Sequence, residues 1–238
     1  MTDFKYVGTE LGFFAHAINW KRYWGSKIAP FMGRRILEVG AGIGGTTAVL
    51  SQGDYDRWLG LEPDPQMVLD LQARQQQGEF PDYCEFVVGT VATLPDDAVF
   101  DSAIYIDVLE HIEHDAAEVE QVAKHIAPGG HIIVLSPAFQ FLFSEFDAAI
   151  GHYRRYTRPM LREISPPDFD TRLSIYLDSL GMLLSLGNRV MLRAPSPTLG
   201  QIKFWDRVFV PTSRVTDKLC LHSLGRSVLH VWERKSQS

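Results

Sequence analysis

Short apolar runs alternate with longer segments in which apolar residues recur at helical spacing along most of the chain. The runs predict buried strands and the segments predict amphipathic helices. Alternation of strand and helix is typical of an α/β fold in which helices cover both faces of a mainly parallel sheet. The predicted strands are residues 36–39, 57–62, 84–88, 102–106, 131–135, 171–177 and 227–232.

Two apolar segments lie outside this alternation. Residues 11–28 carry a wide apolar arc at helical spacing, and we expect most of it to pack on the sheet. Residues 178–226 separate the last two predicted strands. Helical spacing at 182–192 and 201–221, split by the prolines within 195–197, predicts a helical cap there. A dimer interface or a membrane-docking face is the alternative role for this apolar surface.

Residues 36–45 carry the most chemical information. They read ILEVGAGIGG, a buried strand followed by a glycine-rich turn that opens a helix. Gly40 and Gly42 have no Cβ, so the backbone can turn sharply and a ligand can approach it closely. The first N–H groups of the next helix point at the same place. Glu62 ends the following strand, where a carboxylate can accept both hydroxyls of a ribose.

The order E-x-G-x-G-x-G, followed by an acidic residue after the next strand, resembles the class I S-adenosylmethionine-dependent methyltransferases. The resemblance covers about residues 30–165 and the final strand. It implies an α/β fold with a Rossmann-like, doubly wound, seven-stranded sheet. That sheet is mostly parallel, with an antiparallel last strand, and carries helical cap insertions. The resemblance also implies S-adenosyl-L-methionine as cofactor.

The predicted domain organisation has four parts. Residues 1–33 are expected to form an N-terminal helical lid, because such a helix often closes over the cofactor in similar methyltransferases. Residues 34–177 form the cofactor-binding core, with a substrate-covering insertion at 137–160. Residues 178–226 form a helical cap insertion, and residues 227–234 return to the core as its final edge strand.

The predicted cofactor site follows from the same resemblance. Glu38 is placed to reach a ligand ammonium, and Glu62 to hold the ribose. Thr90 stands where the family usually has an aspartate that meets the adenine amino group, so its hydroxyl gives a weaker contact. The backbone N–H of Val91 can serve regardless. The predicted set is Glu38, Gly40, Ala41, Gly42, Gly44, Glu62, Pro63, Thr90, Val91, Asp107, Val108 and, from the N-terminal helix, Trp20.

The segment after residues 131–135 is the most individual part of the chain. It is rich in phenylalanine and ends in Gly-His-Tyr-Arg-Arg-Tyr at 151–156. It leaves the carboxyl end of a strand, so it must pass over the mouth of the site. The phrase G-H-x-R-R-Y resembles a subgroup of small-molecule and glycolipid-type methyltransferases. The predicted substrate-binding residues are His16, Phe14, Phe139, Tyr153 and Arg154; the arginines have internal pairing with Glu145 and Asp147 as an alternative.

The predicted catalytic residues are His152 and, second to it, His111. A histidine with the ordinary pKa near 6.5 is partly basic at neutral pH, so either can position or deprotonate an acceptor. A structural hydrogen bond is the alternative role for both. The sulfonium of the cofactor already activates the methyl group, and no set of residues has metal-ligand spacing. We therefore expect no metal.

Net charge and cysteine content limit the kinds of molecule that the chain is expected to bind and the compartment in which it is expected to work. The formal net charge of -6 and the pI of about 5.7 argue against a nucleic-acid binder that relies on its overall field. Cys84 and Cys220 lie far apart and fit two ordinary thiols in a reducing cytoplasm. No run has transmembrane length without a charge, and the first residues lack an apolar signal segment. We expect a cytoplasmic enzyme with a small-molecule acceptor, with a homodimer as an open possibility.

Methyl transfer from S-adenosyl-L-methionine to a small organic acceptor is the leading function. The alternatives are an NAD(P)-dependent Rossmann oxidoreductase and a non-catalytic cofactor-binding module. Glu62 would suit the ribose of NAD equally well. Glu38, however, would lie near a pyrophosphate and repel it, and we find no second nucleotide-binding half in the sequence.

Overall fold

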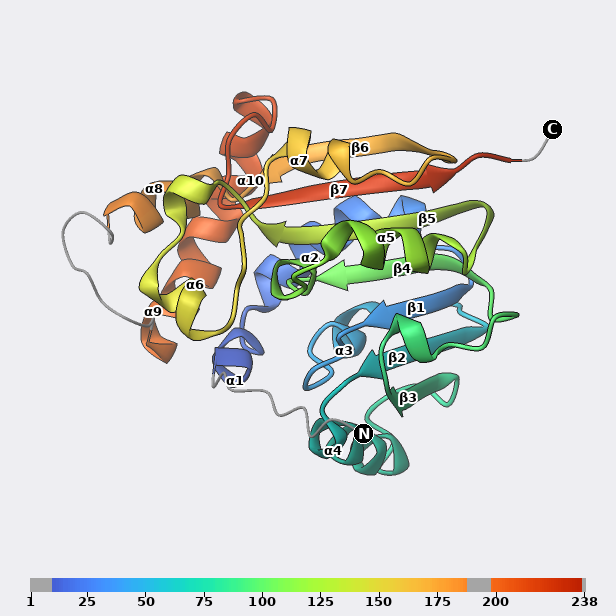
Figure 1. The fold of residues 1–238 in the computed structure, drawn as a ribbon. Helices are drawn as coiled ribbons and strands as arrows, with labels where there is room; N and C mark the ends of the chain where they lie inside the picture. Colours follow the sequence, from blue (N-terminus) through green and yellow to red (C-terminus); the bar gives the residue numbers. More distant parts are fainter. Residues whose placement is uncertain (1–9, 188–197, 237–238) are drawn as a thin grey trace.

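The computed structural model describes residues 10–187 and 198–236, and its sheet has seven strands in the order β3-β2-β1-β4-β5-β7-β6 (Figure 1). Neighbouring strands among β1 to β5 are parallel, and β7 is antiparallel to both of its neighbours. This confirms the predicted Rossmann-like, doubly wound α/β fold. The strands are β1 (Arg35–Val39), β2 (Arg57–Glu62), β3 (Cys84–Val88), β4 (Phe100–Ile106), β5 (Ile126–Pro137), β6 (Phe169–Leu177) and β7 (Ser227–Arg234).

The last strand is not the edge strand that we expected. β7 lies between β5 and β6 and pairs with both. Val228, Leu229, Val231 and Trp232 are fully buried in it, which is the pattern of a strand covered on both faces. β6 is partly exposed over most of its length and forms the edge instead. The run Val228–Trp232, apolar apart from the buried His230, fits this central position.

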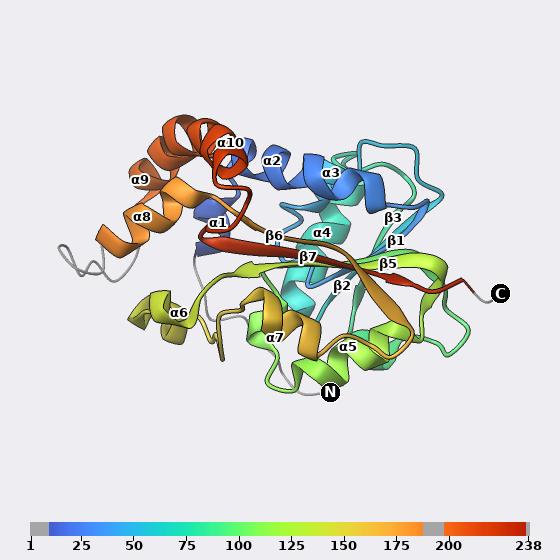
Figure 2. The same ribbon diagram turned by 90° about the horizontal axis from the view of Figure 1, so that it is seen from above.

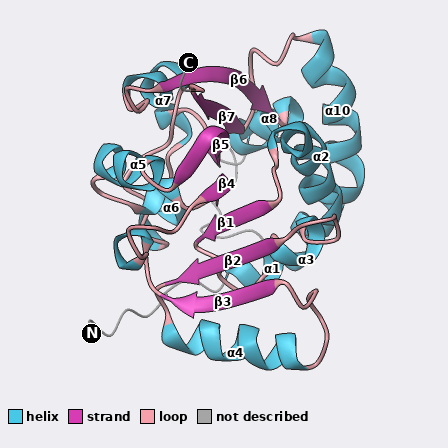
Figure 3. Cartoon of the chain, turned by 90° about the vertical axis from the view of Figure 1, so that its right-hand side faces the viewer, coloured by secondary structure: helices cyan, strands magenta, loops and turns pink. Residues whose placement is uncertain are grey.

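Helices cover both faces of this sheet, as Figures 2 and 3 show from two directions. Two clusters of buried side chains follow the same division, with Trp24 and Trp58 in one and Tyr105 and Trp232 in the other. One face carries α2 (Ile18–Ile28), α3 (Thr47–Leu50) and α4 (Pro65–Gln76), and the other carries α5 (Asp115–Ala123) and α7 (Arg158–Glu163). The sheet is therefore the middle layer of three.

The carboxyl ends of the parallel strands meet the predicted insertion. In Figure 1 the arrowheads of β1, β2, β4 and β5 point toward the side on which α1 (Glu10–Phe14) and α6 (Glu145–Ala149) lie. A short 3₁₀ turn, Leu109–His111, follows β4 on that side. Backbone pairing of Ala138 with Tyr156 closes the insertion at its base. This edge of the sheet is where ligands of such folds bind.

The predicted single helix at 11–28 is two helices, α1 and α2, with a break around His16. The α2 N-terminus takes its acceptor from elsewhere in the chain: the carboxylate of Asp206 accepts the N–H groups of Asn19 and Trp20 at 3.2 and 2.8 Å. Three residues of α2 are fully buried: Tyr23, Trp24 and Ile28. α2 is thus part of the core, which leaves α1 as the described helix of this segment for a movable lid.

The described part of the segment between β6 and β7 is helical, as predicted, and residues 188–192 of the first predicted helix lie outside the described ranges. It comprises α8 (Ser179–Gly187), α9 (Leu199–Phe204), a π-helical turn (Trp205–Phe209) and α10 (Val210–Leu219). The proline-containing split at 195–197 lies outside the described residues. None of the helices in the described ranges combines the length and apolar character needed to cross a membrane.

Buried aspartates tie this helical cap to α2 and β6. Asp217 accepts hydrogen bonds from the Tyr23 hydroxyl and from the N–H groups of Asp178 and Ser179, all within 2.9 Å. Asp178 in turn accepts from the Trp205 indole N–H at 2.9 Å. Because buried polar groups are costly to leave unpaired, these bonds make the cap and α2 one packed unit.

Candidate active site

The glycine-rich turn has the open backbone that the sequence predicts. Gly40, Gly42 and Gly44 all have positive φ angles, a conformation that favours glycine. The N–H groups of Gly40 and Ala41 donate to the Leu61 carbonyl, which fixes the turn to β2. A Cβ built on Gly42 would meet a single described atom within 4 Å, Cδ1 of Leu11 at 3.7 Å. The turn is therefore open at Gly42, with α1 beside it.

Glu62 ends β2 directly against this turn. Its Oε2 accepts the Gly42 N–H at 2.8 Å, and its Oε1 accepts the Asp64 N–H at 3.0 Å. Burial raises the pKa of this carboxyl group, and the two N–H groups oppose that rise. Pro63 follows in the chain, and the N–H of Gly89 donates to the Glu62 carbonyl, which brings the end of β3 to the same place. Each Glu62 oxygen keeps a second lone pair for a ligand hydroxyl.

Thr90 and Val91 follow β3 beside Glu62. Thr90 is exposed, and its backbone N–H and carbonyl both bond the Thr93 hydroxyl. Val91 is fully buried. Both residues stand where an adenine contact was predicted, and the contact itself stays a prediction.

Glu38 lies beneath the turn. Its Oε2 accepts the Thr47 hydroxyl at 2.6 Å and the Trp58 indole N–H at 2.7 Å. The side chain is 2% exposed, and burial raises its pKa to about 7, against the lowering effect of those bonds. In these contacts Glu38 joins β1 to β2 and α3. A contact with a ligand ammonium stays a prediction.

Lys21 is a site residue that the sequence interpretation missed. It is 9% exposed, and its Nζ lies 2.7 Å from where a Cβ on Gly45 would stand. Burial lowers the pKa of its ammonium group, while the negative charges of Asp107 and Glu38 oppose this effect. Position 21 lies four residues after the buried Ala17, on the apolar face of the helix. A lysine on an apolar face was the signal that could have found it.

Trp20 and the residues before it occupy different surroundings. Trp20 is buried against Tyr23 and Trp205, with ring centroids 6.2 and 5.8 Å away. Phe14 packs against the same core, whereas His16 is exposed in the break between α1 and α2. The predicted roles of these residues in cofactor or substrate contact are not tested by this packing.

The residues after β4 bring acidic groups to the same edge. Asp107 has a positive φ angle and is exposed, and Val108 packs against Gly40. Glu110 is fully buried; its Oε2 accepts the Ser136 hydroxyl at 2.9 Å. Burial, reinforced by the Asp107 charge, raises the pKa of Glu110 well above its usual range.

His152 and His111 lie next to each other at this edge. Their ring centroids are 4.5 Å apart in an edge-to-face arrangement. His152 Nδ1 is 2.9 Å from Oδ1 of the buried Asp147, and its Nε2 is 3.9 Å from Oε1 of Glu110. Burial lowers the pKa of His111 to about 4, so this imidazole is neutral at pH 7.

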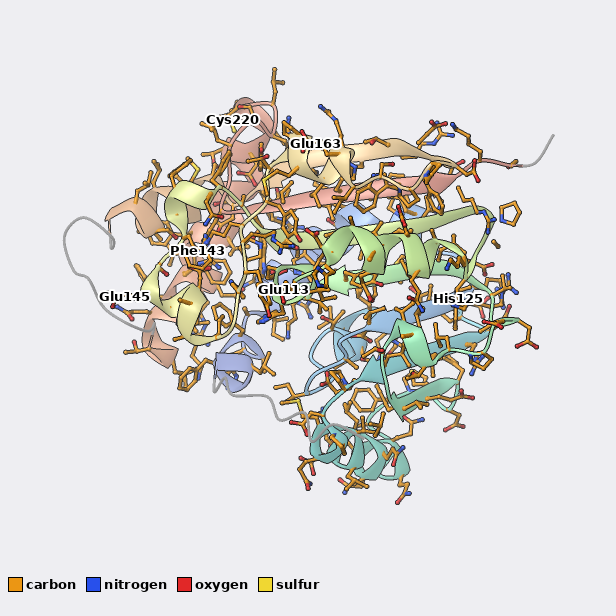
Figure 4. The ribbon with its side chains drawn as sticks, viewed as in Figure 1. Glu113, His125, Phe143, Glu145, Glu163 and Cys220 are labelled. Atoms are coloured by element: carbon orange, nitrogen blue, oxygen red, sulfur yellow. The ribbon has the colours of Figure 1, made fainter. Side chains whose placement is uncertain are left out.

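The two arginines of the insertion pair internally. Arg155 donates to both carboxylate oxygens of Asp147 at 2.9 Å, one of the partners considered from the sequence. Burial alone would raise the pKa of Asp147, but bonds from His152 and Arg155 hold it well below its usual range. Arg154 instead pairs with Asp115 at 2.7 Å and donates to two carbonyls, one of them that of Glu113, which is labelled in Figure 4.

The aromatic residues of the insertion divide into two groups. Phe139 stacks on Phe141 and Tyr176, with centroids 5.2 and 4.5 Å away, so its ring packs toward β6. Tyr153 is 52% exposed next to His152. Figure 4 places Phe143 and Glu145 at the outer part of the insertion. The structure thus gathers Glu62, Gly42, Asp107, His111 and His152 along one sheet edge, with Tyr153 at its surface.

Comparison with known proteins finds a similar domain. Residues 37–132, which include the turn, Glu62 and the segment after β4, match the model of a methyltransferase domain. The match agrees with the class predicted from the sequence.

Two curated relatives are similar over longer stretches. Ajmaline N-methyltransferase of Rauvolfia serpentina is 26% identical over 195 residues, 81% of this chain and 62% of its own length. A ubiquinone biosynthesis O-methyltransferase of Paracidovorax citrulli is 28% identical over 66% of this chain and 68% of its own length. The chain spans less than two thirds of the ajmaline enzyme.

Solved structures share the fold at low identity. A putative methyltransferase of Haloferax volcanii, in complex with its Trm112 activator, has a TM-score of 0.64 at 16% identity, covering 95% of this chain and 93% of its own. The N-methyltransferase NodS of Bradyrhizobium japonicum, solved with S-adenosyl-L-homocysteine, has a TM-score of 0.56 at 12% identity, covering 90% and 86%. The [4+2]-cyclase SpnF has a TM-score of 0.62 at 13% identity, covering 91% and 81%. The fold alone therefore does not fix the reaction.

Proposed function

We propose that the chain transfers a methyl group from S-adenosyl-L-methionine to a small organic acceptor. The observation that carries this proposal is the open turn at Gly42 with the Glu62 carboxylate against it, inside a stretch that matches a methyltransferase domain. A carboxylate at the end of the second strand suits a ribose diol, and open backbone beside it suits a ligand that passes close to the chain.

The residues at this edge fit the charges of the cofactor. Its methionine part carries a carboxylate and an ammonium group. The Lys21 ammonium, next to Gly45, suits the carboxylate, and the exposed Asp107 suits the ammonium. When bound, the cofactor supplies a methyl group already activated on a sulfonium. The chain then has to hold both reactants and deal with the acceptor proton.

The acceptor end is assigned to His152 and His111. Asp147 holds the His152 ring through Nδ1, which leaves Nε2 directed toward Glu110 and the strand ends. An imidazole fixed in this way can position or deprotonate an acceptor. The relatives named above methylate through N or O, so amines, phenols and other hydroxyl compounds are the acceptor classes to test. We further assign the Gly-His-Tyr-Arg-Arg-Tyr phrase to a small-molecule and glycolipid-type subgroup.

Binding and turnover assays test this function. Calorimetric titration with S-adenosyl-L-methionine should give a saturable isotherm, whereas NADH should not bind. Transfer of a labelled methyl group to a panel of phenols, catechols and amines then identifies the acceptor. Binding of NADH in place of S-adenosyl-L-methionine would reject the proposal in favour of the oxidoreductase alternative. The comparisons do not favour that alternative.

A homodimer and a cytoplasmic location remain part of the proposal.

Replacing Glu62 tests the cofactor site. Charge-assisted hydrogen bonds contribute about 1.5–3 kcal/mol each by deletion, so Glu62→Ala should weaken S-adenosyl-L-methionine binding by roughly tenfold to a few hundredfold. Glu62→Gln, which keeps one carbonyl oxygen for the turn, should show the loss with less effect on folding. Glu85→Ala, on the exposed part of β3, is the control. Calorimetric affinities equal to that of the wild type in both Glu62 variants would refute the assignment.

Hydrogen exchange tests the lid. Because Leu11 lies over the turn and α2 is core, bound cofactor should slow amide exchange in α1, at residues 10–14. Exchange within α2 should be slow with and without cofactor. Mass spectrometry of the two states measures both segments at once. Identical exchange of α1 in the two states would exclude a lid made by this helix.

A further inference from the structure

Glu110 holds a buried oxygen that its surroundings do not satisfy. Oε2 accepts the Ser136 hydroxyl, but Oε1 is buried and has no hydrogen-bond partner among the described residues. A buried carboxylate oxygen is costly unless a donor, a proton or a cation compensates it. The Tyr153 N–H donates to the Glu110 carbonyl at 2.8 Å, which holds the 3₁₀ turn after β4 against the insertion.

Two imidazoles lie around this oxygen. His152 Nε2 is 3.9 Å from Oε1, too far for a hydrogen bond. One possible ligand atom from each of Glu110, His111 and His152 lies within 4.8 Å of the others. Ligand atoms on a common first-row metal ion lie roughly 3–4 Å apart, since each metal–ligand bond is about 2.0–2.2 Å. Closing the set on an ion thus takes shifts of under about 1 Å.

The groups behind the histidines complete the arrangement. Metal-binding histidines usually donate their second ring N–H to a carboxylate or a backbone carbonyl. Asp147, 1% exposed, takes this position on His152 at 2.9 Å and is itself held by Arg155. His111 is hydrogen-bonded to the backbone at Ile150 and Gly151. Both rings are therefore oriented from behind.

We propose that Glu110, His111 and His152 bind a divalent first-row transition-metal ion at the acceptor end of the site. Two imidazole nitrogens and one carboxylate oxygen suit such ions better than Mg²⁺ or Ca²⁺, which prefer oxygen ligands. Three protein ligands leave at least one coordination position open, as in catalytic rather than structural sites. The metal-free expectation drawn from the sequence is replaced by this site.

The catalytic role of the ion, unlike its binding, rests on the proposed methyl transfer. An acceptor hydroxyl in the open position would have a lowered pKa, as metal-bound water has. Its O–H bond breaks, the electron pair stays on oxygen, and the proton passes to water or to the exposed Asp107 carboxylate. The oxygen then bonds the methyl carbon while the sulfur keeps the electron pair of the broken C–S bond. In this arrangement His152 is a ligand and not the base.

Metal titration tests the site without cofactor or acceptor. The full chain is stripped with EDTA, dialysed and titrated calorimetrically with Zn²⁺. We expect about one ion per chain. Loss of one ligand in Glu110→Gln or His152→Asn should weaken Zn²⁺ binding by at least about 100-fold, and Asp147→Asn, which alters the group behind His152, by about 10–100-fold. Co²⁺ should give a visible absorption band in the wild type that the ligand variants lose.

His114→Ala is the matched control, because this exposed histidine lies near the set without belonging to it. Its Zn²⁺ affinity should equal that of the wild type. Circular dichroism identifies a variant that fails to fold. In that case the Co²⁺ absorption band of the wild type still shows which kinds of donor atom bind the ion. Absence of Zn²⁺ binding in the wild type, or binding unchanged in all three variants, overturns the metal site. If the wild-type chain binds Zn²⁺ but does not bind S-adenosyl-L-methionine, the proposed function is overturned and the metal site is not.

Discussion

His152→Ala is expected to lower kcat for methyl transfer by about 10²–10⁴-fold, the range that a group handling the acceptor proton contributes. The same loss is expected whether His152 takes the proton or holds a metal ion that acidifies the acceptor. Affinity for S-adenosyl-L-methionine should change little, since the proposed cofactor contacts are the turn and Glu62, which follow β1 and end β2. Steady-state kinetics with the acceptor found in the screen measure kcat, and calorimetry measures the cofactor affinity.

One further variant, a control and EDTA treatment together separate the possible roles of His152. His152→Gln can accept a hydrogen bond but cannot act as a base, and its amide is a poor metal ligand. His114→Ala, at an exposed position, should retain full turnover. EDTA treatment should reproduce the His152→Ala loss in the wild type if the metal acts, and should leave turnover unchanged if the imidazole alone is the base. Near-normal turnover in both His152 variants would make this residue structural.

Asp217→Ala is expected to lower the free energy of unfolding by about 3–5 kcal/mol, because two buried donors and one half-buried donor lose their acceptor and each fully buried unsatisfied group costs about 1–3 kcal/mol. These donors are the Tyr23 hydroxyl of α2, the N–H of Asp178 directly after β6, and the N–H of Ser179 at the start of α8. Urea denaturation followed by fluorescence gives the change in midpoint and slope.

Val215→Ala is the control for this effect, because Val215 lies in the same helix and is 58% exposed. It should change the unfolding free energy by well under about 1 kcal/mol. If the cap and α2 form one packed unit, both variants should unfold in a single transition. An early, separate transition of the cap in Asp217→Ala, or stability equal to that of the control, would contradict this.

The strands and the glycine-rich turn could be predicted because their signals are local. A short, mostly apolar run suffices to predict a buried strand. Gly40 and Gly42 specify a backbone shape that few other residues adopt. The pairing of Glu62 with the turn followed from the rule that the carboxyl ends of parallel strands share an edge. The methyltransferase match agrees with this inference.

The remaining features depend on contacts between distant parts of the chain. His152 comes beside Glu110 and His111 for two reasons. β4 and β5 pair, and the N–H of Tyr153 donates to the carbonyl of Glu110, which lies far away in the sequence. Spacing along the sequence gives no sign of this set, so the metal-free prediction followed. The break between α1 and α2 likewise depends on Asp206, nearly two hundred residues away.

Lys21 is an intermediate case. Its position on the apolar face of a helix was visible in the sequence, but its purpose depended on Gly45, whose missing side chain leaves room for the ammonium group. A charge on an apolar face indicates that something compensates it, and the identity of that partner comes only from the fold.

The central position of β7 also governs how the chain assembles during synthesis. β6 leaves the ribosome about fifty residues before β7, yet its sheet hydrogen bonds are made to β7. Until residues 227–234 emerge, β5 has an open edge and β6 has no strand to join, so both offer unpaired backbone to other chains. The sheet can be completed only after translation of this last strand. Nascent chains paused before it should therefore depend on chaperones far more than finished ones.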